Sequence, residues 1–138
     1  MEFETNDWDS PFSGNGVRII KSHTFAHHLN DLKNTKFPII LVYRNDYECM
    51  KWWLEAGGFD ITYPNYKPYY KDNANMFNQI QSQNKDIMKF IWDNRTRITQ
   101  VSNNYELANA VNISCNGNEH HNYKLKDTTV YVYQSKVS

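Results

Sequence analysis

The hydrophobic positions of the first third of the chain form two short apolar runs that are joined by an amphipathic segment. Val17–Lys21 is rich in β-branched residues and predicts a strand. Thr24–Leu32 carries apolar residues at helical spacing and predicts a helix. Ile39–Tyr43 is a continuous apolar run, which is typical of a strand that is covered on both faces in a parallel sheet. The order strand, helix, strand therefore predicts a βαβ unit with a right-handed crossover.

The pattern after this unit is mainly helical. Apolar residues recur with a helical period from Cys49 to Ala56, and Gly57 and Gly58 then end the helix. Period-two alternation near the end of the chain predicts a strand or hairpin. The predicted elements are a helix that is capped by Asn45-Asp46, begins near Asp46 and ends at Gly57, a connector rich in tyrosine and proline at 59–72, helices at 73–94 and 103–111, and the terminal strand or hairpin at 123–134.

These elements predict one α/β domain over residues 1–138, with residues 1–15 as a polar lead-in. We expect three layers, in which helices flank a small, mostly parallel sheet. The hydrophobic content of 40% and the aromatic content of 15% are typical of a globular chain with a real core.

Charge and cysteine content narrow the class of protein. Fifteen basic and fifteen acidic residues balance, so broad binding to nucleic acid or to a membrane surface has no electrostatic basis. Cys49 and Cys115 form no CxxC motif, the N-terminus is too polar for a signal peptide, and no apolar run could span a bilayer. We therefore expect a cytoplasmic protein in which any anion-binding site is local.

Cationic and titratable side chains lie at the ends of both predicted strands. Lys21 is the last residue of the first predicted strand, and Ser22 and His23 follow it. Arg44 and Asn45 follow the second strand. Parallel neighbours end at the same sheet edge, where open α/β sheets bind their ligands, and an arginine there can fork onto a phosphate. His23 has the titration range of a general base. The alternative is that these are ordinary capping and strand-end residues in contact with solvent.

The sequence gives little support for a metal site. Two histidine pairs, His23 with His27 and His120 with His121, lack a carboxylate or cysteine at a recognisable ligand spacing, and we predict no metal. The chain also contains no GxxxxGK[ST] loop.

The stretches "RIIKSH" (Arg18–His23) and "PIILVYRND" (Pro38–Asp46) together resemble the core of sulfotransferases that use 3′-phosphoadenosine 5′-phosphosulfate. In that family, a strand ending in Lys-Thr/Ser-His is followed by a helix and by a second strand ending in Arg-Asn/Asp. The resemblance covers about Val17–Gly58 and implies a P-loop-like fold. It also implies transfer of a sulfuryl group from this co-substrate to a hydroxyl acceptor.

The resemblance also implies roles for single residues. His23 resembles the base that takes the proton of the acceptor hydroxyl, and Lys21 resembles the lysine that stabilises charge on the transferring group. Arg44 resembles the arginine that holds the 3′-phosphate, with Ser22 and Asn45 in the same cofactor-binding set.

The chain departs from the family at two points. Trp52 occupies the position of a second 3′-phosphate ligand, which is a serine in the family. The family's 5′-phosphosulfate loop is not found in the sixteen residues before Val17.

Two main hypotheses of function follow from these residues. The first is a sulfotransferase-like protein in a complete, truncated or inactive form, acting on a small hydroxyl compound. The second is a non-enzymatic accessory domain that binds a nucleotide, an anion or a protein. A phosphotransferase relative is a third, weaker interpretation.

The composition suggests a source for the chain. Abundant asparagine, with more lysine than arginine, is typical of AT-rich phage genomes, and a phage-encoded protein of this kind would be located in the host cytoplasm. Exposed sheet edges would favour homo-oligomers.

Overall fold

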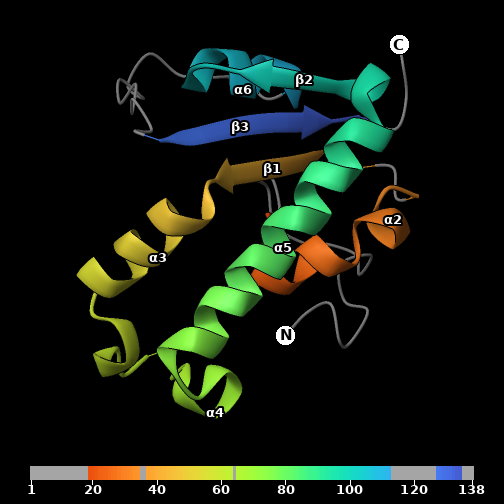
Figure 1. Cartoon of the computed structure of the whole chain (residues 1–138). Coiled ribbons are helices and arrows are strands. Elements are labelled where there is room, and N and C mark those ends of the chain that lie inside the picture. Colours follow the sequence, from red (N-terminus) through yellow and green to blue (C-terminus); the bar gives the residue numbers. More distant parts are fainter. Residues whose placement is uncertain (1–18, 35–36, 64, 113–126, 135–138) are drawn as a thin grey trace, which may run out of the picture.

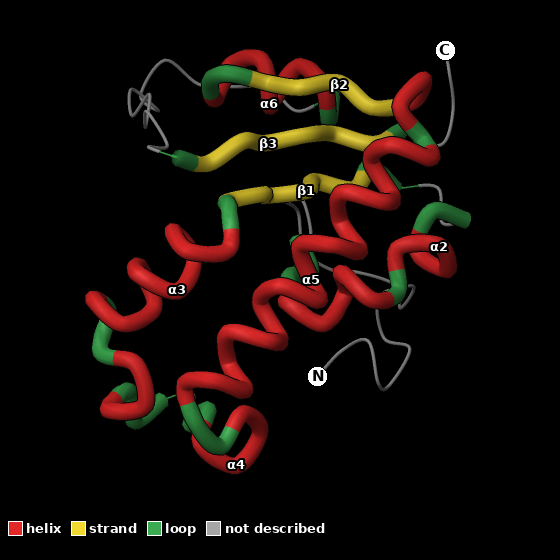
Figure 2. Tube along the Cα trace, in the orientation of Figure 1, coloured by secondary structure: helices red, strands yellow, loops and turns green. Residues whose placement is uncertain are grey.

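The computed structural model describes residues 19–34, 37–63, 65–112 and 127–134. The described elements run in the order η2 (His23–His27), α2 (Leu29–Leu32), β1 (Ile39–Arg44), α3 (Asp46–Glu55), η3 (Gly58–Asp60), α4 (Lys67–Tyr70), α5 (Asn73–Asp93), η4 (Arg95–Arg97), β2 (Ile98–Val101), α6 (Asn104–Ala110) and β3 (Thr128–Tyr133), where η marks a 3₁₀ helix. Figure 2 shows which parts of the trace are helix, strand and loop.

The described strands form one antiparallel sheet of three strands in the order β1-β3-β2 (Figure 1). The last strand of the sequence is therefore central, and it pairs with β1 on one side and β2 on the other. Tyr133 lies opposite both Ile39 and Ile98, and Thr128 lies opposite Arg44.

The prediction of a mostly parallel sheet is wrong, because each described pair of neighbouring strands is antiparallel. The apolar run at 39–43 indicates a strand but carries no information on the direction of its neighbour. The strand is also not covered on both faces, as the run had predicted. Leu41 on one face is buried, while Ile40 and Val42 on the other face are 43% and 58% exposed.

The predicted first strand is not formed in its described part. Residues 19–22 are irregular, whereas Val17 and Arg18 lie outside the described residues. Ile19 is 79% exposed, so its β-branched side chain has no sheet face to cover. Without this strand and with an antiparallel partner for β1, the described structure contains no βαβ unit.

The two faces of the sheet are covered by different helices. On one face, α5, α2 and η2 pack over a buried cluster that consists of Leu29, Leu32, Leu41, Phe90 and Tyr133. On the other face, α6 packs over β2 and β3, where Val101, Val130 and Val132 are buried. Because α6 does not extend over β1, Ile40 and Val42 on that face stay exposed.

The helices were predicted better than the sheet. Helices α3, α5 and α6 confirm the three larger predicted helices, which were expected to begin near Asp46, at 73 and at 103. Helix α3 ends before Gly57, whose φ of 123° favours glycine. The amphipathic segment at 24–32 is divided into η2 and α2, and the connector contains the short helices η3 and α4. β3 confirms a terminal strand, while residues 123–126 lie outside the described part.

None of the described helices has the length and apolarity that crossing a membrane requires.

Candidate functional site

The predicted site residues belong to two different parts of the fold. Lys21–His23 lead into η2, which packs against α5, whereas Arg44 ends β1 and packs against α3. The shared edge of two parallel strands, which would have brought them together, is not formed in the described residues. The expectation of a parallel sheet edge that joins the two sets is therefore corrected. Each set has its own contacts.

Arg44 is held by two side-chain contacts at the end of β1. Its Nε donates a hydrogen bond of 2.8 Å to Oγ1 of Thr128, the residue opposite it on β3. Its Cζ lies 4.8 Å from the centroid of the Trp52 ring, which is close enough for a cation–π interaction. Among the described residues, none forms a hydrogen bond with the two terminal nitrogens of this guanidinium. These nitrogens form the fork that binds phosphate or carboxylate in a bidentate way.

The backbone of Arg44 is fixed by a buried side chain of α5. Asn84 is 8% exposed, and its Nδ2 donates hydrogen bonds to the Arg44 carbonyl oxygen at 2.7 Å and to Oδ1 of Asp46 at 2.8 Å. The Cys49 thiol also donates to the Arg44 carbonyl oxygen, at 3.2 Å. These bonds tie the junction between β1 and α3 to α5, so the position of Arg44 depends on three elements.

The contacts of Cys49 indicate that its thiol supports the fold and does not act as a nucleophile. Burial is the largest cause that raises the pKa of its thiol above the ordinary value, so the thiol stays protonated near pH 7. A protonated thiol that donates to a backbone oxygen is a poor nucleophile. Cys49 therefore stabilises the turn after β1.

Asn45 has a capping role in this structure. Its side chain accepts a hydrogen bond of 2.9 Å from the backbone N–H of Glu48 and so caps α3. The first turn of α3 also contains Asp46 and Glu48, whose negative charges are stabilised by the helix dipole. An anion would be repelled by these two carboxylates, so the fork of Arg44 is a better anion ligand than the amides of α3.

Ser22 and His23 lie at the start of η2. The Oγ of Ser22 accepts a hydrogen bond of 3.3 Å from the backbone N–H of Thr24 and caps this 3₁₀ helix. The pKa of His23 is lowered from its ordinary value, first by desolvation of the ring and second by the positive charge of Lys21. The residue as a whole is exposed, so the desolvation is partial. His23 is neutral near pH 7, which is the form that a general base requires.

The pKa of His23 is a testable property. An NMR titration of the His23 ring is expected to give a pKa below 6.5, and Lys21→Met is expected to raise it because one of the two causes is removed. Lys51→Met is the matched control and should leave the pKa unchanged. Since the unfolded chain binds this proton more tightly, the contribution of His23 to stability is present above pH 6.5 and is lost as the pH falls through its lowered pKa. A measured pKa at or above 6.5 would contradict the assignment.

Other histidines give no metal site in the described part of the chain. Nδ1 of His27 donates a hydrogen bond of 2.6 Å to Oδ2 of Asp86 on α5, and this contact fastens η2 to α5. The described residues contain no group of three or more side chains that could hold a metal ion. His120 and His121 lie outside the described residues.

The sequence located Arg44 at a strand end but missed the residues that position it. Thr128 lies 84 residues from Arg44, and Asn84 lies 40 residues from it. Asn84 belongs to the polar centre of α5, where nothing in the sequence distinguishes a buried asparagine from an exposed one.

No protein-family model, curated protein or solved structure matches this chain. Function is therefore inferred from the contacts of Arg44 and of His23.

Proposed function

We propose that this chain is a nucleotide-binding domain, in which the Arg44 guanidinium binds a phosphate group of an adenine nucleotide such as adenosine 3′,5′-bisphosphate. The observation that carries the proposal is the way Arg44 is held. Thr128 accepts a hydrogen bond from Nε and the Trp52 ring lies against the guanidinium, while no other described residue forms a hydrogen bond with the side chain of Arg44. This is the non-enzymatic hypothesis, and it does not need a parallel sheet.

Preorganisation is the physical reason why this arginine is a good ligand. A free arginine loses rotamer freedom when it binds, and that entropy offsets part of the gain from two charge-assisted hydrogen bonds. Arg44 has already lost much of that freedom, because its side chain contacts Thr128 and Trp52 and its backbone is held by Asn84. A phosphate dianion would then gain both hydrogen bonds at a smaller entropic cost.

The surrounding charge limits the affinity. Asp46 and Glu48 follow Arg44 closely, and the whole chain has a formal net charge of zero. We therefore expect moderate affinity that falls as ionic strength rises, because screening weakens the attraction of an exposed ion pair.

Calorimetry tests this proposal. Adenosine 3′,5′-bisphosphate is expected to bind the unmodified chain, and Arg44→Ala is expected to lower the affinity at least about tenfold because two charged hydrogen bonds are lost. Arg44→Lys should recover only part of it, since an ammonium cannot bind in a bidentate way.

Arg95→Ala is the matched control for this experiment. Arg95 also lies over a tryptophan, with its Cζ 4.3 Å from the centroid of the Trp92 ring. Its loss should leave nucleotide affinity unchanged. The proposal fails if the unmodified chain does not bind, or if Arg44→Ala and Arg95→Ala bind equally well.

Sulfuryl transfer is the second candidate function, and the lowered pKa of His23 favours it. In this reaction the oxygen of an acceptor hydroxyl attacks the sulfur of 3′-phosphoadenosine 5′-phosphosulfate. The bond from sulfur to the bridging phosphate oxygen breaks, the hydroxyl proton goes to His23, and Lys21 offsets the charge on the transferring group. A radiolabelled transfer assay with a panel of hydroxyl acceptors tests it, with His23→Gln as the inactive variant. Binding without transfer would reject this candidate and leave the nucleotide-binding proposal intact.

A further inference from the structure

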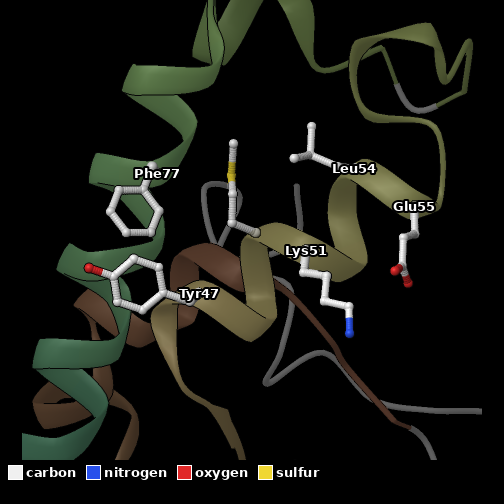
Figure 3. A pocket seen from close by; sticks show the side chains of 6 residues that line it. Tyr47, Lys51, Leu54, Glu55 and Phe77 are labelled. Atoms are coloured by element: carbon white, nitrogen blue, oxygen red, sulfur yellow. The ribbon is translucent and has the colours of Figure 1, made fainter.

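An open apolar groove lies between α3 and α5 (Figure 3), and its lining does not include Arg44, Trp52 or Thr128. It has a volume of about 540 Å³, and its apolar lining consists of Tyr47, Met50 and Leu54 from α3 and Phe77 from α5. Tyr47 is 77% exposed and Leu54 is 49% exposed. The rings of Tyr47 and Phe77 lie 5.4 Å apart, so they join the two helices at one end of the groove. We call this the α3–α5 groove.

Two opposite charges border the α3–α5 groove. Lys51 and Glu55 are one helical turn apart on α3, and both line the groove. Lys89 and Asp93 on α5 have the same spacing and form an ion pair at 2.9 Å. Lys51 and Glu55 form no ion pair with each other or with another described residue, and Figure 3 shows their charged ends apart. Both are therefore available to a molecule that enters the groove.

We propose that the occupant of the α3–α5 groove is a second copy of this chain, with the two α3 helices packed antiparallel about a two-fold axis. A two-fold axis requires a self-complementary surface. In the antiparallel arrangement, Lys51 faces Glu55 of the second copy and Glu55 faces Lys51 of the second copy. Both ion pairs form at once, and Met50 packs near Leu54 of the second copy.

This charge pattern is the reason for choosing a second copy over an unrelated partner. An apolar peptide would require only the stripe of Tyr47, Met50 and Leu54. Opposite charges one turn apart beside an apolar stripe are the arrangement that sets partner and orientation in paired helices. The groove does not include Arg44, so the inference is independent of nucleotide binding.

The interface would be small. A helix of ten residues is about 15 Å long, which is short for a stable dimer even with Phe77 extending the contact. We therefore expect a reversible dimer with a dissociation constant on the order of 10 μM.

Sedimentation equilibrium over a concentration series tests the dimer. The unmodified chain is expected to change from monomer to dimer in this range. Lys51→Glu and Glu55→Lys are each expected to weaken self-association at least about tenfold, because like charges then face each other at both contacts. An equimolar mixture of these two variants is expected to recover the dimer, since each reversed charge now faces its complement.

Lys89→Glu is the matched control, because it reverses the lysine of an exposed pair with the same spacing on α5. It should leave the dimer unchanged. Lys51 and Glu55 are exposed, so their reversal should preserve the fold, and circular dichroism checks this. A monomeric unmodified chain at 200 μM would overturn the proposal. So would dimers that persist in both charge variants, or a mixture that associates no better than its components.

Discussion

Phe90→Ala is expected to lower the free energy of unfolding by about 3–5 kcal/mol. Phe90 is 4% exposed and belongs to the buried cluster between α5 and the sheet. Its ring packs edge-on against Tyr133 with the centroids 5.1 Å apart. Truncation removes this contact and leaves a cavity at the point where α5 covers the central strand. Urea unfolding followed by circular dichroism measures the loss.

Met88→Ala on the same helix is the control for this prediction. Met88 is 41% exposed, so its truncation removes little buried surface and should cost less than about 1 kcal/mol. Equal losses for the two variants would contradict the placement of Phe90 in the core.

Asn84→Ala is expected to lower the free energy of unfolding by about 2 kcal/mol, because it removes two hydrogen bonds from a buried position. The Arg44 carbonyl and the Asp46 carboxylate lose their common donor. Since the backbone of Arg44 then becomes less fixed, the affinity for adenosine 3′,5′-bisphosphate should fall as well. Urea unfolding and calorimetry on the same variant measure the two effects.

Two further variants sharpen the test of Asn84. Asn84→Asp should destabilise the chain at least as much as Asn84→Ala near pH 7, because a carboxylate would face two oxygen acceptors. Asn78→Ala changes an exposed asparagine of the same helix and should cost less than about 0.5 kcal/mol. If Asn84→Ala were as mild as Asn78→Ala, the Asn84 hydrogen bonds would not hold the junction between β1 and α3.

Local signals in the sequence predicted the larger helices correctly. The helical period of apolar residues located α3, α5 and α6, and their caps are side chains next to the helices that they cap: Asn45, Asp72 and Asn103. These signals act within a few residues, so they can be read without knowledge of the tertiary structure.

The sheet could not be predicted in the same way. The apolar run at 39–43 identified β1, but its partner is the last strand of the chain, and the two are antiparallel. The direction of a strand relative to its neighbour depends on which distant segments pair. Neither the run at 39–43 nor the last strand contains a local signal for that pairing. The segment Val17–Lys21 was predicted as a strand from its composition alone, and composition does not show whether a partner strand is present. Its described residues are irregular, and Ile19 is exposed.

In the candidate site, too, local features could be predicted from the sequence and contacts between distant residues could not. Arg44 was predicted because a cation after a buried strand is a local feature. The contacts that give it a defined geometry come from Thr128 and Asn84, which are distant in sequence. The predicted grouping of Arg44 with Lys21 and His23 was argued from a parallel sheet, which the described strands do not form.

The most direct measurement of the central claim is NMR of the Arg44 side chain during a titration with adenosine 3′,5′-bisphosphate. The ¹H–¹⁵Nε signal of Arg44 can be assigned by its loss in Arg44→Lys. We predict that this signal shifts in a saturable way, with the dissociation constant that calorimetry gives, while the signal of Arg95 stays in place. Binding that leaves the Arg44 signal unmoved, or no binding at all, would contradict a phosphate site at Arg44.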